Sequence, residues 1–330
     1  MNLTVNNPLW LAPLAGVTVP SVRRFFWRLG AGLTHTEMIS AVGVIRGNRK
    51  TAGMLKILPG EGPVVLQLFA PGVRSLVEGA EKALEISSDI NKTQFAALGV
   101  NMACPMPKVT KRGAGAALMN APDTAFEMVK ELKKLSFPVW IKTRRSEGER
   151  PESLSRTLRF AHMLLEAGAD NICIHGRSPA QRYEGKADKE IVRALAALFP
   201  SQVSSSGDVY TPEDVLEYMG MGCVGVMLAR GAVANPFLFQ NSLLTLGLSA
   251  PFEPCERDDT FDARVELLLK LSGELKDECG ERLAVVLLKR LLAGVLKGFR
   301  KSSEARRAVG VVTDFDEAMR ILRSFADRPF

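Results

Sequence analysis

The sequence predicts a parallel eight-stranded β/α barrel followed by an all-helical region. Eight short β-rich runs alternate with helix-like stretches in the 330-residue chain, and no strand pattern follows Pro236. The runs begin roughly 30 residues apart, the length of a βαβ unit, and several are apolar almost throughout, as strands buried on both faces are. We therefore expect a barrel over residues 1–243 and a helical domain over residues 244–330.

Each predicted strand is a short run rich in β-branched and other apolar residues. The eight runs cover residues 9–12, 33–37, 64–69, 96–102, 139–143, 171–175, 202–205 and 224–228. Helical periodicity is clearest at residues 75–86, 124–135, 154–167 and 212–219. The last of these helices follows Thr211 and begins at Pro212, which is a helix cap with proline at the first helical position.

A doubly wound open sheet is the alternative architecture. It would carry a glycine-rich phosphate-binding turn directly after a strand. The nearest glycine cluster, Gly113 and Gly115, has Leu118 where the third glycine belongs, and it follows no strand directly. The barrel is therefore the preferred prediction.

The clearest helix of the C-terminal region is expected over residues 282–301. On a helical wheel its basic side chains fall within an arc of about 120°, opposite an apolar face. The basic residues are Arg282, Lys289, Arg290, Lys297, Arg300 and Lys301. The apolar face comprises Leu283, Val285, Leu287, Leu288, Leu291, Leu292, Val295, Leu296 and Phe299.

Basic residues are concentrated in this part of the chain. Residues 282–307 hold eight basic residues and one acid, which matches the whole formal net charge of +7. Solvated faces normally mix charges of both signs, so this composition indicates a polyanionic partner such as nucleic acid. A solvated charged face is the alternative interpretation.

Composition excludes several classes of protein. Hydrophobic residues make up 46% and charged residues 24% of the chain, which is typical of a globular protein and excludes a disordered or coiled-coil chain. The five cysteines show no CxxC spacing and only three histidines are present, so we expect neither a disulfide framework nor a metal centre. No signal peptide or membrane-spanning run is apparent. We expect a cytoplasmic monomer.

Polar or glycine-containing clusters end nearly every predicted strand, where barrels have their active sites. The clusters are residues 13–16, 36–37, 67, 101–105, 142–144, 175–177, 206–208 and 229–231. The last two clusters follow the seventh and eighth strands, where barrels frequently bind phosphate. They predict a phosphorylated cofactor or substrate, although glycines in such loops are often only turns.

Cys104 is the candidate for chemistry among the cysteines. It lies in a loop with several prolines and glycines, next to the basic residues of 108–112. A thiol there could be a nucleophile, an acid or a small buried side chain, and the loop favours a chemical role. Cys173 and Cys223 lie in or beside apolar runs and are expected to be buried side chains only. Taken alone, His175 fits a buried imidazole equally well.

Residues 101–115, which read Asn-Met-Ala-Cys-Pro-Met-Pro-Lys-Val-Thr-Lys-Arg-Gly-Ala-Gly, closely resemble the active-site loop of the tRNA-dihydrouridine synthases. The resemblance extends to residues 12–18, 67–69, 174–177 and 225–232. The order and spacing of these motifs fit the family over residues 8–240, and the helical tail suits its C-terminal domain. The sequence is most similar to the bacterial B-type branch.

The resemblance implies an FMN-dependent enzyme that reduces specific uridines in tRNA to 5,6-dihydrouridine with NADPH. Hydride would pass from N5 of reduced FMN to C6 of uracil, and Cys104 would supply the proton at C5. FMN would be bound by Pro13, Leu14, Ala15, Gln67, Lys142, His175, Ser206, Gly207, Asp208, Ala229 and Arg230. Asn101 would lie near the reacting base, and Arg177 near substrate or flavin. On the basic helix, Lys289, Lys297 and Arg300 would contact the RNA.

The sequence departs from the family pattern at three positions. Ser206 stands where the family usually has asparagine, Ala229 where it has glycine, and Val19 where it often has aspartate. FMN is still expected, because an alanine methyl group can face away from a phosphate if φ is negative.

Two other functions remain open from the residues alone. One is a phosphate-binding barrel enzyme that uses Cys104 as a nucleophile or Lys142 as a Schiff-base former. Such a protein would be colourless and indifferent to RNA. The other is a non-catalytic RNA-binding protein, which would bind tRNA without flavin turnover.

Overall fold

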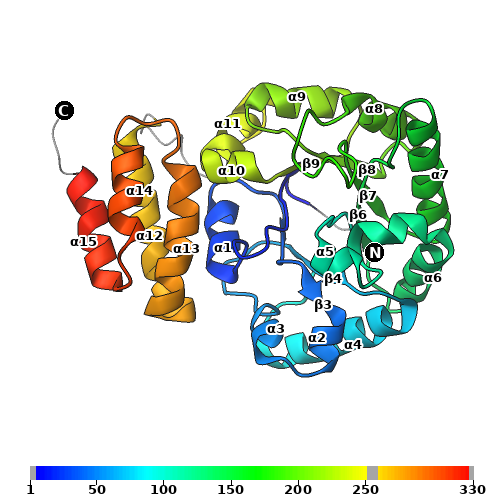
Figure 1. The fold of residues 1–330 in the computed structure, drawn as a ribbon, viewed down its shortest axis with the longest axis horizontal. Coiled ribbons are helices and arrows are strands. Elements are labelled where there is room, and N and C mark those ends of the chain that lie inside the picture. The colour runs from blue at the N-terminus through cyan, green and yellow to red at the C-terminus, as the bar shows by residue number, and fades with distance from the viewer. Residues whose placement is uncertain (1–4, 251–258, 327–330) are drawn as a thin grey trace.

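The computed structural model describes residues 5–250 and 259–326 and shows a closed parallel barrel (Figure 1). Its sheet has the order β1-β9-β8-β7-β6-β5-β4-β2 and closes where Trp10 pairs with Leu33. The strands are β1 (Leu9–Leu11), β2 (Thr34–His35), β3 (Ile39–Ser40), β4 (Val64–Phe69), β5 (Ala97–Met102), β6 (Val139–Arg144), β7 (Asn171–His175), β8 (Val203–Ser206) and β9 (Gly225–Leu228). The predicted barrel is confirmed. One short strand, β3, was not predicted and pairs with β4.

Helices surround the barrel strands as a β/α barrel requires (Figure 1). They are α1 (Pro20–Arg28), α2 (Ala41–Ile45), α3 (Arg49–Gly53), α4 (Val73–Ile90), α5 (Pro107–Thr110), the 3₁₀ helix η1 (Gly115–Asn120), α6 (Pro122–Lys133), α7 (Glu152–Glu166), α8 (Lys189–Leu198), α9 (Pro212–Gly220), α10 (Arg230–Ala234) and α11 (Leu238–Thr245). The four helices predicted from periodicity are α4, α6, α7 and α9. Thr211 caps α9 in a reciprocal capping box with Asp214, as its position before Pro212 predicted.

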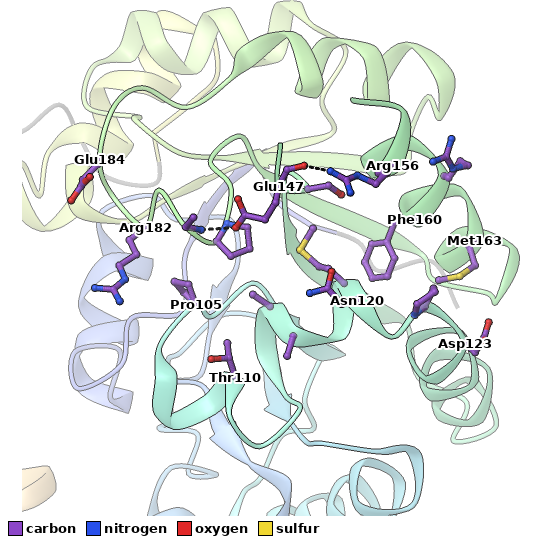
Figure 2. Close-up of a pocket in the computed structure, with 18 residues that line it drawn as sticks. Pro105, Thr110, Asn120, Asp123, Glu147, Arg156, Phe160, Met163, Arg182 and Glu184 are labelled. Carbon is purple, nitrogen blue, oxygen red and sulfur yellow. Dashed lines mark hydrogen bonds between the residues drawn. The ribbon is translucent and has the colours of Figure 1, made fainter. Parts of the chain in front are cut away.

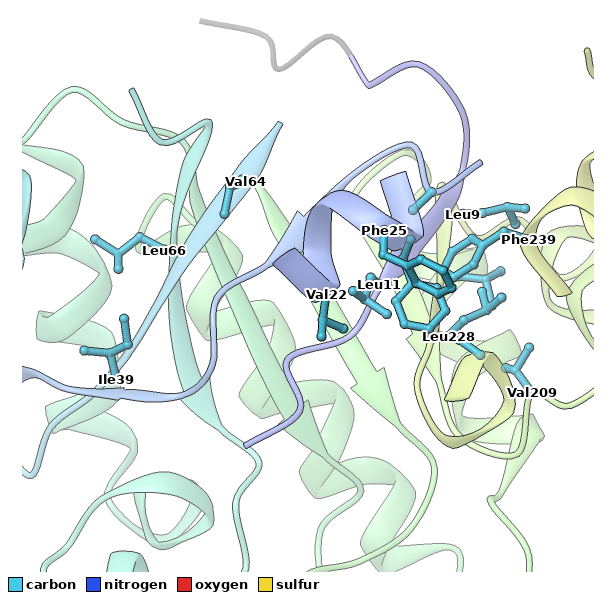
Figure 3. Packing of buried hydrophobic residues seen from close by; sticks show 14 of the residues in the cluster. Leu9, Leu11, Val22, Phe25, Ile39, Val64, Leu66, Val209, Leu228 and Phe239 are labelled. Carbon is cyan, nitrogen blue, oxygen red and sulfur yellow. The ribbon is translucent and has the colours of Figure 1, made fainter. Parts of the chain in front are cut away.

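The strands bury side chains on both faces. Their outer faces pack against the surrounding helices; for example, Leu9, Leu11 and Leu228 lie near Phe25 of α1 and Phe239 of α11 (Figure 3). The inner faces contribute a second cluster that fills the barrel, comprising Trp10, Ala12, Leu33, Val65, Ala97, Trp140, Cys173 and Met227. Such filling leaves the carboxyl ends of the strands as the place for a functional pocket.

Cys173 and Cys223 are buried in this fold, at 1% and 4% exposure, as predicted. Trp10 packs against Trp140 inside the barrel with ring centroids 4.7 Å apart. A Cβ atom at Gly225 would lie 2.3 Å from the Trp10 ring, so the tryptophan fits only because position 225 has no side chain.

Among the described residues, no helix is long and apolar enough to cross a membrane.

The C-terminal helices form a bundle beside α1 and α10 (Figure 1). They are α12 (Phe261–Cys279), α13 (Glu281–Val295), α14 (Ser302–Gly310) and α15 (Phe315–Ala326). The single helix predicted over residues 282–301 is wrong, because α13 ends at Val295 and the chain turns at Gly298 with φ +96°. Lys297 and Arg300 therefore lie in the turn between two helices.

The apolar face predicted for this helix is also wrong at one position. Leu283 is 45% exposed, whereas Leu287 and Leu291 are buried. The predicted domain division at residue 243 falls within α11, and residues 251–258 lie outside the described residues. The division remains a prediction.

Polar contacts fix the bundle to the barrel. The Glu274 carboxylate of α12 accepts hydrogen bonds from Arg24, at 2.7 Å, and from Arg28 of α1. From α13, Arg290 Nη1 donates to the carbonyl of Gly16, at 2.8 Å, in the loop after β1. The bundle therefore reaches the rim of the barrel at the end where the strands terminate.

Candidate active site

A pocket of about 310 Å³ lies at the carboxyl ends of the barrel strands. Among the predicted site residues, it is lined by Pro13, Leu14, Ala15, Asn101, Cys104, Lys142, His175, Ser206, Gly207, Asp208, Ala229 and Arg230. Gln67 and Arg177 are buried and do not line it. Lys289, Lys297 and Arg300 belong to the C-terminal bundle. One pocket thus brings together most residues that the strand ends and the resemblance indicated.

The loop that carries Cys104 is held by the side chain of Asn101. The Asn101 Oδ1 atom accepts hydrogen bonds from the backbone N–H groups of Ala103, at 3.1 Å, and Cys104, at 2.9 Å. Its Nδ2 atom donates to Oε1 of Gln67 at 2.9 Å. Asn101 and Gln67 therefore hold the backbone of the loop that carries the thiol.

Gly115 shapes the other side of the same loop. It has φ +62°, and a Cβ atom there would lie 2.7 Å from the Cys104 carbonyl oxygen. That carbonyl accepts a hydrogen bond from the Ala116 N–H at 3.0 Å. The glycine of the cysteine motif is required because the backbone turns closely against Cys104.

Lys142 lies on β6 beside Asn101 of β5 and points into the pocket. Its Nζ donates to the hydroxyl of Ser206 at 2.8 Å. Burial lowers the pKa of Lys142 below the usual range of lysine. The hydroxyl of Ser206 thus supplies a hydrogen-bond acceptor for this buried amine.

His175 ends β7 and is a neutral donor. Its Nδ1 accepts a hydrogen bond from the Arg177 backbone N–H at 3.1 Å, which places the ring proton on Nε2. Burial, and then the positive charge of Lys142 and neighbouring arginines, lower the pKa of His175 to about 2. A Cβ atom at Gly207 would lie 3.2 Å from Nε2, so the glycine keeps the space beside this donor open.

Arg177 lies behind the pocket. Its guanidinium donates to both carboxylate oxygens of Asp208, at 2.8 and 2.7 Å, and to the carbonyls of Glu184 and Gly185. Burial alone would raise the pKa of Asp208, but hydrogen bonds from Arg177 and the Ala187 N–H, with the charges of Arg177 and Arg230, lower it overall. Arg177 joins the loops that follow β7 and β8.

Three pocket residues, Arg144, Tyr183 and Tyr210, were not assigned a role from the sequence, although Arg144 belongs to the predicted strand-end cluster 142–144. Arg144 donates from Nε to the Ala103 carbonyl at 2.8 Å and from Nη1 to the Arg182 carbonyl at 3.0 Å. The Arg230 guanidinium lies 4.7 Å from the ring centroid of Tyr183 and 5.7 Å from that of Tyr210. Both tyrosines are exposed and lie in the loops that follow strands, Tyr183 after β7 and Tyr210 after β8. The sequence signal for Tyr183 is its position directly after Arg182.

A comparison with known families settles the classification. Residues 10–328 match the family model described as dihydrouridine synthase. The chain belongs to the dihydrouridine synthase family. The predicted family, and an enzyme rather than a binding module, are confirmed. The non-catalytic RNA-binding alternative is accordingly disfavoured.

Curated members of the family match nearly the whole chain. A probable tRNA-dihydrouridine synthase from Treponema pallidum is 30% identical over 93% of this chain and 90% of its own length. tRNA-dihydrouridine synthase B from Vibrio cholerae is 28% identical over 99% of this chain and 98% of its own length. The resemblance to the B-type branch agrees with these matches.

Solved barrels show the same fold at low sequence identity. The old yellow enzyme from Trypanosoma cruzi has a TM-score of 0.55 at 12% identity and covers 75% of this chain and 91% of its own. Morphinone reductase has a TM-score of 0.53 at 15% identity, covering 76% and 88%. These similarities support the barrel architecture alone.

Proposed function

We propose that this protein binds FMN in the pocket at the strand ends and uses NADPH to reduce specific uridines of tRNA to 5,6-dihydrouridine. The observation that carries the proposal is the position of Cys104. The family's cysteine loop holds this thiol in the same pocket as the buried amine of Lys142 and the neutral imidazole of His175.

The residues present fit a flavin mononucleotide. The volume of about 310 Å³ is within the range of ligand pockets, roughly 300–1,000 Å³. Lys142 and Nε2–H of His175 are donors for the flavin ring or its phosphate. Gly207 has no side chain that could obstruct a phosphate. Ala229 has a negative φ of −124°, which is the condition under which its methyl group can face away from a phosphate. Arg230 offers a charged donor at the rim.

Each part of the site has a role in the proposed reaction. Bound FMN would accept hydride from NADPH and deliver it to C6 of uracil. Cys104 donates the proton to C5, and Asn101 and Arg144 hold the loop that aims the thiol. The target uridine must leave its stack to enter the pocket. We also propose that Lys289, Lys297 and Arg300 contact tRNA phosphates and position the RNA.

The role of Cys104 is tested by Cys104→Ala. The variant should bind FMN and be reduced by NADPH at a near-normal rate, because neither step places a proton on uracil. Its reoxidation by tRNA should slow by roughly 10²–10⁴, the usual worth of one positioned acid. Rapid-mixing absorbance measures both steps. Dihydrouridine formation at the wild-type rate with saturating tRNA would make Cys104 a structural residue.

Two further measurements separate the rival functions. A wild-type reaction in deuterated solvent should place solvent deuterium at C5, and deuteride from labelled reduced flavin should be found at C6. The label at C6 separates the two roles, because a cysteine that bonds to C6 would also leave solvent deuterium at C5. A visible spectrum of the purified protein should show flavin. A colourless protein that ignores RNA would instead support the phosphate-binding barrel enzyme that uses Cys104 or Lys142 covalently.

A further inference from the structure

A second cavity opens on the flank of the barrel and meets the active-site pocket. Its volume is about 910 Å³, and it lies between η1, the start of α6, α7 and the loop after β7. Pro105 and Arg182 line both cavities. In Figure 2 these two residues lie toward one end of the cavity, and Met163 and Asp123 toward the other. We call this cavity the flank groove.

We propose that the flank groove binds the adenosine end of NADPH, with its 2′-phosphate on Arg156 and Arg159, while the nicotinamide reaches the flavin past Pro105. The inference rests on the proposed function. With both groups bound, the C4–H bond of the dihydronicotinamide would break and its hydride would pass to flavin N5. NADP⁺ would leave, and solvent would supply the proton that completes flavin reduction.

Arg156 and Arg159 are three residues apart in the first turns of α7, so both point to the same side of the helix. Arg156 donates to the Glu147 carbonyl, and its nearest carboxylate oxygen, on Glu152, is 3.6 Å away. Arg159 donates to the Ser155 hydroxyl at 2.6 Å, and no carboxylate of the described residues lies within 4 Å of it. Such weak surface partners exchange readily for a phosphate dianion.

The middle of the groove is apolar. Phe160 is buried at 7% exposure and, with Met163 and Met119, lines the cavity between the two arginines and η1. Aromatic and thioether side chains offer a flat, adaptable surface for a purine ring. The volume also suits a dinucleotide fragment, because ligand pockets extend to roughly 1,000 Å³.

Charge distribution favours a small ligand over RNA in this groove. Its lining carries three acids, Asp123, Glu147 and Glu184, against three arginines. A strand of phosphates along the groove would meet these carboxylates. In NADPH the 2′-phosphate needs only Arg156 and Arg159, and the third arginine, Arg182, is the cation left for the diphosphate. The basic bundle lies on the other side of the barrel from α6 and α7 (Figure 1). The RNA and the reductant therefore approach the pocket from different sides.

Arg182 stands between the two cavities. It is one of the few non-glycine residues with positive φ, at +49°, and Arg144 holds its carbonyl. Pro105 follows Cys104 directly, so a ligand that leaves the flank groove past Pro105 arrives at the thiol and the flavin pocket. Backbone strain of this kind is typical of functional sites.

The test compares the double variant Arg156→Gln/Arg159→Gln with Arg193→Gln, an exposed arginine on α8 outside the groove. Anaerobic rapid mixing of the FMN-loaded proteins measures flavin reduction by NADPH and by NADH. The double variant should need roughly 10- to 100-fold more NADPH for half saturation, since charge-assisted hydrogen bonds to one phosphate are lost. Its limiting rate, its response to NADH and its KM for tRNA should be unchanged, as should every property of the control.

A binding measurement gives a readout other than turnover. Calorimetry should show adenosine 2′,5′-bisphosphate binding to the FMN-loaded wild type and to Arg193→Gln but not to the double variant. Equal NADPH requirements for all three proteins would overturn the inference, as would an increase in KM for tRNA with NADPH unaffected. An equal loss for NADH would refute the 2′-phosphate contact. If the wild type binds the bisphosphate but forms no dihydrouridine, the proposed function is contradicted and the phosphate site is not.

Discussion

At the scale of single residues, the pocket holds two buried bases, His175 and Lys142, and the pKa of each is lowered by burial. His175, whose pKa is lowered to about 2 by burial and neighbouring cations, stays neutral throughout the working pH range. Lys142 is buried too, and its pKa falls below the usual value of about 10.4. We therefore expect any alkaline pH dependence of flavin binding to come from Lys142 rather than from His175.

Lys142→Ala should largely lose FMN, because the variant lacks the buried donor beside Ser206. In the wild type, the FMN dissociation constant should rise as pH increases toward and through the lowered pKa, where the amine loses its charge. Fluorescence titration of free FMN between pH 6 and 10 measures both effects. Full flavin occupancy with unchanged affinity in Lys142→Ala would contradict the assignment.

Asp208→Asn should destabilise the fold by about 2–3 kcal/mol at pH 7, because it removes a charge-assisted partner of buried Arg177. A carboxyl group with a lowered folded pKa stabilises above its unfolded value of about 3.9, and that contribution is lost as pH falls through the folded pKa. The difference from wild type should therefore shrink in acid. Urea unfolding at pH 7 and pH 3 measures it; a difference that is the same at both pH values would refute the ion-pair explanation.

At the scale of elements, the sequence predicted those features that depend on local pattern. Apolar runs such as residues 64–69 indicated the strands. The geometry of a barrel then predicted that Cys104 and Lys142, which follow strand ends, lie in one pocket. The prediction of one helix over residues 282–301 was wrong, because a helical wheel shows only the spacing of side chains and not the positive-φ turn at Gly298. Tyr183 was missed because it lies in a loop whose path depends on tertiary contacts.

The basic side chains of α13 and the following turn are expected to bind tRNA phosphates. Replacing Lys289, Lys297 and Arg300 with glutamine should weaken tRNA binding and reduce the slope of log affinity against log salt by about 0.7–0.9 for each lost contact. Flavin reduction by NADPH should be unaffected. The matched control replaces three exposed lysines of the α3–α4 side, which are Lys50, Lys82 and Lys92. An unchanged salt slope in the first variant would identify a merely solvated face.

At the scale of the whole molecule, the helical bundle and the active site are joined by a direct contact. Arg290 of α13 donates to the carbonyl of Gly16, and the N–H of Gly16 donates to the buried carboxylate of Glu37. Gly16 directly follows Ala15, which lines the active-site pocket. The bundle thus supports the loop that the proposed flavin would contact, in addition to carrying basic residues.

Arg290→Gln should weaken FMN binding by roughly 2- to 10-fold, the range expected from the net worth of one hydrogen bond. Arg282→Gln, on the same helix, is the matched control and should leave FMN affinity unchanged. Flavin fluorescence titration measures both. If the two variants bind FMN equally well, the bundle does not support the flavin loop.

The contact between Gly16 and Arg290 joins positions 274 residues apart in the chain. During synthesis, at roughly 5–20 residues per second, the loop after β1 is made about 14–55 s before its partner on α13. In a nascent barrel this loop therefore lacks its hydrogen bond from Arg290 until nearly the whole chain has been made. We expect flavin to be captured late in translation, so that ribosome-bound chains stalled before α13 would retain less FMN than released ones.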